Sequence, residues 1–325
     1  MILSVDLGGT NARFAFCDIT SARPVIKDLK VFPSQDFGSA PELFFNFSAS
    51  HDMKPSAAIV AVPGPVLRER GDLVARITNL PWTVIRSQVK EALGIENTLL
   101  VNDVAAAASF LSVSKESDYQ VLHTGRAMTD QKVGNSLFVS LGTGVGASQY
   151  LETNKNSEQA GFSIIPSELG HCAAPLTDSE ELGFGDFLDS EGRKRSIEEA
   201  ISGDGLENCY RFFSKKDISA AEVNSLIRGG KDPHAKSAFA LYQKLLGKTL
   251  ASLALAFSPS KGIYLAGGVS SKLSDIFDHE IIVKEYLNFG ELAHLREATE
   301  IRILKTENAG IIGAAALSKA GVVIS

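Results

Sequence analysis

The sequence has few cysteines and no long apolar run. Its three cysteines, Cys17, Cys172 and Cys209, form no CxxC pair, which indicates reduced thiols rather than a disulfide framework. No uncharged stretch approaches the length of a membrane span. Residues 1–6 lack the basic region of a signal peptide and enter an apolar strand pattern at once. We therefore expect a cytoplasmic protein with no membrane partner.

Runs of positive charge are also missing. The formal net charge is −6, and no Lys/Arg cluster interrupts the chain, so a nucleic-acid partner is not expected. Hydrophobic residues make up 44% and charged residues 22% of 325 residues. This composition is typical of a globular protein, and the length allows two domains with a sizeable core.

Glycine-rich turns that follow short apolar runs are the main positive feature. Residues 2–5 read as a buried strand that ends at Asp6, and Gly8 and Gly9 then turn the chain into a partner strand over residues 14–17. Glycine lets backbone N–H groups approach a phosphate closely. An ordinary hairpin turn gives the same local pattern. Polar residues beside this turn are Thr10, Asn11 and Arg13.

The pattern of a strand followed by glycine occurs twice more. An apolar run over residues 135–140 leads into a Leu-Gly-Thr-Gly-Val-Gly turn at 141–146. Another run, over residues 263–266, ends in Gly267 and Gly268. Three such turns predict one nucleotide held between two related halves of the chain.

Together these motifs resemble those of bacterial-type glucokinases, within the actin, sugar-kinase and heat-shock chaperone ATPase superfamily. Residues 6–13 are similar to the first phosphate loop of that family, residues 141–146 to its second phosphate loop, and residues 266–268 to its adenosine turn. The resemblance extends to Asn102-Asp103, the Glu-Leu-Gly-His segment at 168–171, and Glu198.

The resemblance implies a fold and a nucleotide site. The fold is an α/β, two-domain actin-like (ribonuclease H-like) ATPase fold with the nucleotide and sugar in the interdomain cleft. Residues 1–113 would form a small α/β domain completed by the C-terminal helix 309–325, and residues 114–308 a large α/β domain. The implied nucleotide-binding residues are Val5, Asp6, Leu7, Gly8, Gly9, Thr10, Gly142, Thr143, Gly144, Gly267 and Gly268.

Local patterns also predict individual elements. Thr83 is positioned to cap a helix over residues 84–93 that Gly94 ends. A strand at 98–101 precedes a helix at 104–111, so strands and helices alternate as in an α/β sheet. Further along we expect mainly helix at 179–227, a long helix at 232–257, a strand at 301–304, a helix at 310–320 that packs back onto the first domain, and loops at 129–135 and 154–159.

Asp103 is the candidate general base. It follows a buried strand, where ligands collect in α/β sheets, and an alcohol that attacks a phosphoryl group needs a carboxylate near its proton. Because Asp103 directly precedes a helix, the residues alone favour an N-cap instead. The resemblance favours the base, and it implies that Asn102 binds sugar hydroxyls, since an amide both donates and accepts.

The resemblance implies further sugar ligands. Glu168 and His171 lie three residues apart and can converge on vicinal hydroxyls. The alternatives are a solvated carboxylate and a structural histidine. Glu198 is implied by its place before a Ser-Gly turn, although its neighbour Glu199 competes for that role, and Asn79 is expected to help close the sugar pocket.

Other motifs are excluded by spacing. Gly247-Lys248-Thr249 is similar to the end of a Walker loop, but Tyr242 stands where its first glycine is required. The middle turn lacks dinucleotide spacing, and no Gly-x-Ser-x-Gly elbow occurs. Neither a hydride-transfer enzyme nor a hydrolase is indicated.

Two departures from related families affect the site. The related regulator-and-sugar-kinase family has a cysteine-rich zinc segment after its Glu-x-Gly-His, but Cys172 is followed by Ala-Ala-Pro, so we expect no zinc. Bacterial glucokinases usually carry Ser-Gly-Pro-Gly where this chain has Asp204 in place of proline.

The resemblance therefore implies ATP-dependent phosphorylation of glucose at the 6-hydroxyl, giving glucose 6-phosphate and ADP, with Asp103 as general base. Mg²⁺ would be carried with the nucleotide, Asp6 would orient its waters, and a homodimer is expected. The alternatives are a kinase for another hexose or an N-acetyl amino sugar, and a sugar-sensing regulator with a degenerate kinase domain. The regulator needs a DNA-binding helix pair, for which the opening strand is expected to leave no room. ADP or polyphosphate in place of ATP also stays open.

Overall fold

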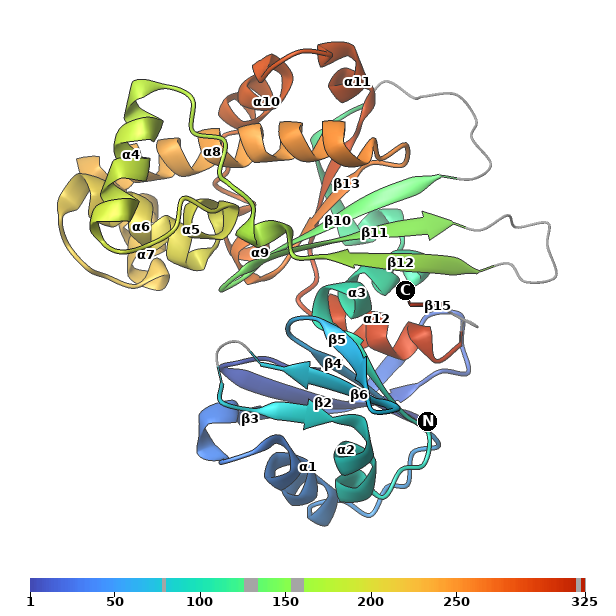
Figure 1. Cartoon of the computed structure of the whole chain (residues 1–325). Helices are drawn as coiled ribbons and strands as arrows, with labels where there is room; N and C mark the ends of the chain where they lie inside the picture. The colour runs from blue at the N-terminus through green and yellow to red at the C-terminus, as the bar shows by residue number, and fades with distance from the viewer. Residues whose placement is uncertain (78–79, 126–133, 153–160, 320–322, 325) are drawn as a thin grey trace. The chain divides into compact units, whose positions relative to one another are not determined.

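The computed structural model describes all residues except 78–79, 126–133, 153–160, 320–322 and 325 (Figure 1). Its contacts divide the chain into two compact units. The first comprises Met1–Lys115, Tyr150–Pro166 and Asn308–Ser325, and the second comprises Glu116–Gln149 and Ser167–Glu307. The predicted domain boundaries, 1–113 with 309–325 and 114–308, stay a prediction.

A five-stranded sheet is the centre of the first unit. Its order is β3-β2-β1-β4-β8. The hairpin of β1 and β2 pairs Leu7 with Ala12 across the first glycine turn, and β1, β4 and β8 are parallel. The carboxyl ends of these parallel strands therefore share one edge with that turn. The strands are β1 (Ile2–Leu7), β2 (Asn11–Asp18), β3 (Val25–Pro33), β4 (Ala58–Val62) and β8 (Thr98–Asn102).

Helices cover both faces of this sheet (Figure 1). On one face, α1 (Ala40–Ala49) and α2 (Arg86–Leu93) bury phenylalanine and leucine side chains against β1 and β2. On the other face lie α3 (Asp103–Ala108), continued by the 3₁₀ helix η2 (Ser109–Val113), and α12 (Ala309–Leu317). The predicted return of the C-terminal helix is confirmed, because Ser4 Oγ donates to the Ile311 carbonyl at 2.7 Å. Close approach to α3 requires glycine, since a Cβ at Gly313 would lie 2.0 Å from the Ala106 carbonyl oxygen.

The prediction that Thr83 caps a helix over 84–93 is wrong. Thr83 begins a short strand, β7 (Thr83–Ile85), which pairs with β6 (Asp72–Arg76) in a small sheet that also contains β5 (Val66–Glu69). Val84 is fully buried and pairs with Ala75. Helix α2 starts only at Arg86, and Gly94 ends it in the left-handed conformation (φ 66°), as expected.

A mixed sheet organises the second unit. Within this unit its strands lie in the order β11-β10-β13-β14-β9, with β10, β13 and β14 parallel and β9 antiparallel to β14. The bounds are β9 (Tyr119–His123), β10 (Asn135–Leu141), β11 (Val145–Glu152), β13 (Ile263–Ala266) and β14 (Ile301–Leu304). In the first unit, β12 (Phe162–Ser167) pairs in parallel with β15 (Val323–Ile324).

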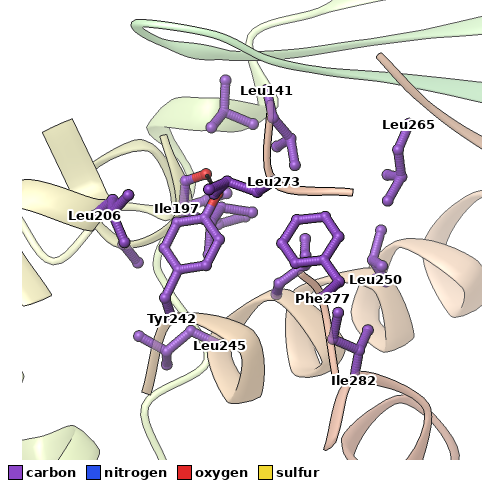
Figure 2. Close-up of a cluster of buried hydrophobic side chains, with 14 of the residues drawn as sticks. Leu141, Ile197, Leu206, Tyr242, Leu245, Leu250, Leu265, Leu273, Phe277 and Ile282 are labelled. Atoms are coloured by element: carbon purple, nitrogen blue, oxygen red, sulfur yellow. Dashed lines mark hydrogen bonds between the residues drawn. The ribbon is translucent and has the colours of Figure 1, made fainter. Parts of the chain in front are cut away.

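The long helix α8 (Pro233–Phe257) forms the core of the second unit. Figure 2 shows Tyr242, Leu245 and Leu250 of this helix among side chains from the sheet and from neighbouring helices. Asp232 caps the helix by accepting from two backbone N–H groups of its first turn. The other helices are α4 (Ser179–Ser190), α5 (Ile197–Ile201), α6 (Gly203–Ser214), α7 (Ala220–Gly229), α9 (Gly268–Leu273), α10 (His279–Asn288) and α11 (Ala293–Ala298).

Lys248, in the sequence that is similar to a Walker loop, belongs to this core. Its Nζ lies 2.5 and 2.7 Å from the carboxylate oxygens of Glu181 on α4 and 2.8 Å from Thr177 Oγ1. Glu181 is fully buried, and 8% of the Lys248 side chain is exposed. The lysine is therefore part of a buried ion pair between two helices, in agreement with its exclusion as a phosphate ligand.

Most predicted elements are present with small shifts at their ends. The strands at 2–5, 135–140, 263–266 and 301–304 and the helices at 179–227 and 232–257 are confirmed. The loop predicted at 154–159 and most of the loop at 129–135 lie outside the described residues. Among the described residues, the three cysteines are free, and no helix is long and apolar enough to cross a membrane.

Candidate active site

The first glycine turn is braced from two sides. Gly8 donates its backbone N–H to the Asn11 carbonyl at 3.0 Å, and a Cβ at Gly8 would lie 2.8 Å from that oxygen. Buried Ser34 donates its hydroxyl to the Gly8 carbonyl at 2.7 Å, and its N–H to the Thr10 carbonyl at 2.9 Å. These bonds fix the carbonyls of the turn. No local sequence pattern connects Ser34 with a turn 26 residues earlier, so its role was not predicted.

Asp6 is the charged side chain at the end of β1. Its neighbours Val5 and Leu7 are fully buried, so these two can offer a ligand only their backbone. Burial raises the pKa of Asp6, and the charge of Arg13 opposes that rise. Arg13 donates to Asn308 Oδ1 at 2.5 Å, at the start of α12. The first unit thus gathers a carboxylate, a guanidinium and the first glycine turn at one sheet edge.

Next to Asp6, α12 begins with small residues. A Cβ at Gly310 would lie 3.2 Å from Asp6 Oδ2, so a glycine at this position leaves room for the carboxylate. No sequence motif marks Asn308 or Gly310 as site residues. Their relationship to β1 is a tertiary contact over about three hundred residues.

Asn102 and Asp103 have different positions at the start of α3, the helix that follows β8. Asn102 is the N-cap of α3, and its Oδ1 accepts from the Ala105 N–H at 2.9 Å. Its Nδ2 donates to the Gly64 carbonyl at 3.1 Å. Asp103 is the first helical residue, partly buried, and its Oδ1 accepts from the Val104 N–H at 2.8 Å. The alternative that Asp103 caps the helix is therefore wrong, because Asn102 is the cap.

The second glycine turn is the centre of the site in the second unit. Gly142 donates its N–H to the Gly144 carbonyl at 2.9 Å and accepts from the Gly203 N–H at 2.8 Å. Gly203 follows Ser202, the N-cap of α6, in the segment that carries Asp204. Thr143 at the tip is exposed. A Cβ at Gly142 would meet only one described atom within 4 Å, the Gly144 oxygen at 3.9 Å.

Glu198 joins this turn to α5. Its Oε2 accepts from the Val145 N–H at 2.9 Å, and a Cβ at Gly144 would lie 2.5 Å from the same oxygen. Glu199 faces elsewhere and pairs with Arg193 at 2.8 Å. The geometry therefore separates the two adjacent glutamates and places Glu198 beside the turn.

The segment of Glu168 and His171 packs against the same strand. It forms the 3₁₀ helix η4 (Leu169–His171), in which a Cβ at Gly170 would lie 2.1 Å from the Val145 carbonyl oxygen. Both Glu168 and His171 are exposed. The segment is also tied to α5, since Ile197 donates its N–H to the Cys172 carbonyl at 2.9 Å. Val145 is thus a shared neighbour of η4 and Glu198.

The third glycine turn meets the second one at the end of β10. Gly267 has φ 95°, and a Cβ there would lie 2.3 Å from the Leu141 carbonyl oxygen. Both the conformation and the approach require glycine. Gly268 starts α9 and has open space around its Cβ position. The structure therefore brings together Gly142, Gly144 and Gly267 with Glu198 and the η4 segment.

One predicted ligand, Asn79, lies outside the described residues. Among the residues that the structure does describe, no group of three His, Cys, Asp or Glu side chains is arranged to hold a metal ion.

Comparison with solved structures defines the class of the protein. A glucokinase from an Antarctic psychrotroph has a TM-score of 0.77 at 26% identity, over 97% of this chain and 98% of that one. A glucokinase of Streptomyces griseus, solved with glucose and AMPPNP, has a TM-score of 0.62 at 20% identity, over 97% of this chain and 98% of that one. The fold is the actin-like two-domain α/β fold of sugar kinases, as predicted.

The sequence comparison identifies the family. The sequence model of the glucokinase family matches residues 3–320. The glucokinase of Xanthomonas euvesicatoria is 28% identical over 97% of this chain and 94% of its own length. The chain belongs to the glucokinase family, and it is a hexose kinase.

Proposed function

We propose that this protein transfers the γ-phosphoryl group of ATP to the 6-hydroxyl of glucose, with Asp103 as general base. Membership of the glucokinase family supports the substrates. The observation that carries the choice of base is the position of Asp103 at the carboxyl end of a parallel strand, next to a residue that already caps the helix. Asp103 is therefore not the N-cap of this helix, and its carboxylate is proposed to accept the proton.

Five residues are proposed to bind sugar hydroxyls. The Asn102 amide makes two internal hydrogen bonds and can offer one further N–H and one further lone pair. Glu168 and His171 are exposed at the start and the end of the η4 segment. Asn79 and Glu198 complete the proposed set. Glu198 contributes its Oε1, since Oε2 accepts from the Val145 N–H. The Glu198 carboxylate would then contact both the sugar and the end of the second glycine turn.

The nucleotide is proposed to bind at the three glycine turns. Close backbone approach explains glycine at Gly142, where this chain leaves the Cβ position nearly empty, and at Gly268, where it leaves it open. The remaining residues of this proposal are Val5, Asp6, Leu7, Gly8, Gly9, Thr10, Thr143, Gly144 and Gly267.

A Mg²⁺ ion carried with the nucleotide would supply charge neutralisation at the phosphates. The donor chemistry at the first turn fits, because Asp6 offers carboxylate oxygens, which Mg²⁺ prefers together with water. Asp6 is proposed to orient the waters of that ion. We expect no zinc, and elemental analysis of the purified protein tests this.

A coupled assay tests the proposed function. Glucose, mannose, fructose and an N-acetyl amino sugar are each combined with ATP, ADP and polyphosphate. We expect the highest kcat/KM for glucose with ATP. A higher value for another sugar would assign a different hexose kinase, and no turnover with any pair would favour the sugar-sensing regulator. A homodimer and a cytoplasmic location stay predictions, and light scattering measures the oligomeric state.

A further inference from the structure

Helix α5 carries Glu198, a proposed sugar ligand, but has only five residues. A helix of little more than one turn is not stable on its own in water, so contacts with the rest of the second unit must hold it. Its buried side chains, Ile197, Ala200 and Ile201, attach it to the core. Apolar burial is non-directional, so the rotation of α5 about its axis depends also on its hydrogen bonds.

The rotation of α5 decides which of two adjacent glutamates faces the second glycine turn. Successive residues of an α-helix are separated by about 100° around its axis. In the structure Glu198 accepts from the Val145 N–H at 2.9 Å, while Glu199 points to another side of the helix and pairs with Arg193. A rotation by one residue would replace one carboxylate by the other at the turn.

Two neighbours hold Glu199 on its own side of the helix. Its Oε2 accepts from Arg193 Nη1 and from Asn208 Nδ2, each at 2.8 Å. Asn208 Nδ2 also donates to the Glu199 backbone carbonyl at 3.0 Å, so one amide bonds both the side chain and the main chain of this residue. Asn208 lies on α6 and is fully buried, where an unpaired donor is costly. We call Arg193, Glu199 and Asn208 the Glu199 network.

A short backbone ribbon connects α5 with the η4 segment. Ala173 and Ser196 form an antiparallel bridge, and the Ala174 N–H donates to the Arg195 carbonyl at 2.8 Å. Ser196 is the N-cap of α5, where its hydroxyl accepts from the Glu199 N–H at 3.3 Å. Because the ribbon follows η4 directly, a displacement of α5 would also move the segment that carries the other two proposed sugar ligands of this unit.

We propose that the Glu199 network positions α5 so that Glu198, and not Glu199, faces the sugar. Arg193 and Asn208 are positioning residues, which act through Glu199 and do not touch the sugar themselves. This inference deepens the proposed function and rests on it, since it takes Glu198 as a sugar ligand.

Glucose calorimetry on variants of the full-length protein tests the proposal. Asn208→Ala removes both hydrogen bonds to Glu199, so the glucose Kd should rise roughly three- to tenfold. Arg193→Ala removes a partly exposed partner and should raise the Kd about twofold. Arg195→Ala is the matched control, because this arginine lies two residues further on and pairs with Asp189 of α4 instead. Its Kd should stay unchanged, and a rise as large as that in Asn208→Ala would overturn the proposal.

A conservative variant separates positioning from a loss of stability. Urea titration identifies conditions in which each variant is fully folded, and there a difference in stability does not change the glucose Kd. In Glu199→Gln the amide oxygen can still accept from Asn208, so most of the glucose affinity should be kept. Glu199→Ala should resemble Asn208→Ala. Equally weak binding in Glu199→Gln and Glu199→Ala would overturn the proposal. If Asn208→Ala does not fold, Arg193→Ala and Glu199→Ala decide in the same assays.

Amide hydrogen exchange of the ligand-free protein tests the geometry without sugar. Because the Val145 N–H bonds to Glu198, its exchange should be faster in both Glu198→Ala and Asn208→Ala and unchanged in Arg195→Ala. Wild-type glucose affinity in folded Glu198→Ala would refute Glu198 as a sugar ligand, and the inference with it. A raised Kd in Glu198→Ala, with wild-type Kd and Val145 exchange in Asn208→Ala, would overturn the inference alone.

Discussion

The Glu198 carboxylate accepts a hydrogen bond from the Val145 backbone N–H at 2.9 Å, directly after the second glycine turn. The same oxygen would lie 2.5 Å from a Cβ at Gly144. Glycine at position 144 therefore leaves room for this carboxylate. At Gly142, two residues earlier, an added Cβ would contact almost no atom of the described chain. Glycine is thus required at the two positions of this turn for different physical reasons, and substitution of each glycine can distinguish the two reasons.

Gly142→Ala and Gly144→Ala should differ in which substrate they affect. In Gly142→Ala the added methyl group meets little of the described chain, so stability should stay within about 0.5 kcal/mol. The KM for ATP should rise roughly tenfold or more through a lost contact to a charged phosphate, with the glucose KM nearly unchanged. Gly144→Ala displaces Glu198, so both KM values should rise. Steady-state kinetics with each substrate varied measures this, and equal effects of the two variants would refute the distinction.

Alanine at Glu168 or His171 should weaken the binding of glucose. If these exposed side chains bind hydroxyls away from the transferred phosphoryl group, each variant should raise the glucose KM by about 10–100-fold. A lower kcat should accompany it, because remote binding energy positions the reacting hydroxyl. Cys172→Ala is the matched control, since this exposed neighbour holds η4 only through its backbone. Wild-type glucose affinity by calorimetry in both variants would contradict the assignment.

The buried pair of Lys248 and Glu181 predicts a large effect on stability. Lys248→Ala leaves the Glu181 carboxylate buried without its cation and should lower the free energy of unfolding by about 3–5 kcal/mol. Lys244→Ala removes an exposed pair with Glu180 on the same two helices and should lower it by less than about 1 kcal/mol. Urea titration measures both. In folded Lys248→Ala the KM for ATP should not change, because the lysine is not a phosphate ligand.

Asp6→Asn should stabilise the fold at neutral pH while it lowers activity. The folded pKa of Asp6 is raised by burial, so the native state loses stability as pH rises from the unfolded value of 3.8 through the folded value. Asparagine removes that loss. The variant should therefore be more stable, by on the order of 1 kcal/mol at pH 7–8, with the difference shrinking toward acid. A lower kcat is expected from the loss of the carboxylate proposed to orient the waters of the metal.

Asp18→Asn is the control for this pH dependence. Hydrogen bonds from the Thr20 backbone and side chain lower the pKa of Asp18, so its stabilising contribution is present at neutral pH and lost toward acid. This variant should be slightly less stable than wild type at pH 7. Unfolding curves over pH 5–8 that show the same sign for both variants would contradict the assignment for Asp6.

The sequence predicted the elements that local pattern controls and missed those that depend on tertiary contacts. The strand and glycine turn at Asp6–Gly9 follow from an apolar run and from glycine chemistry, and both are present. Thr83 was misassigned because its cap-like position gives no sign that Val84 pairs with Ala75 in another strand.

The hydrogen bonds that hold the candidate site could not be predicted either, because they too are tertiary contacts. Ser34 lies 26 residues from the turn that it holds, and Arg13 bonds Asn308 across 295 residues. The sequence pattern offered Asp103 as the cap, although asparagine and aspartate cap helices about equally well and Asn102 is the actual cap. Which of the two caps the helix depends on backbone conformation, which the structure supplies.

Paired substitutions at Asn102 and Asp103 test the base directly. General-base help is typically worth roughly 10²–10⁴-fold. Asp103→Asn keeps the shape and the hydrogen bond from the Val104 N–H but cannot accept a proton, so kcat should fall by at least that order while glucose affinity changes little. Stability should hardly change, because Asn102 caps the helix.

Asn102→Ala should instead lower the free energy of unfolding by about 1 kcal/mol through the lost cap and raise the glucose KM. Stopped-flow phosphoryl transfer, urea titration and glucose calorimetry on both variants distinguish the roles. A folded Asp103→Asn protein with near-normal kcat would show that another group removes the proton.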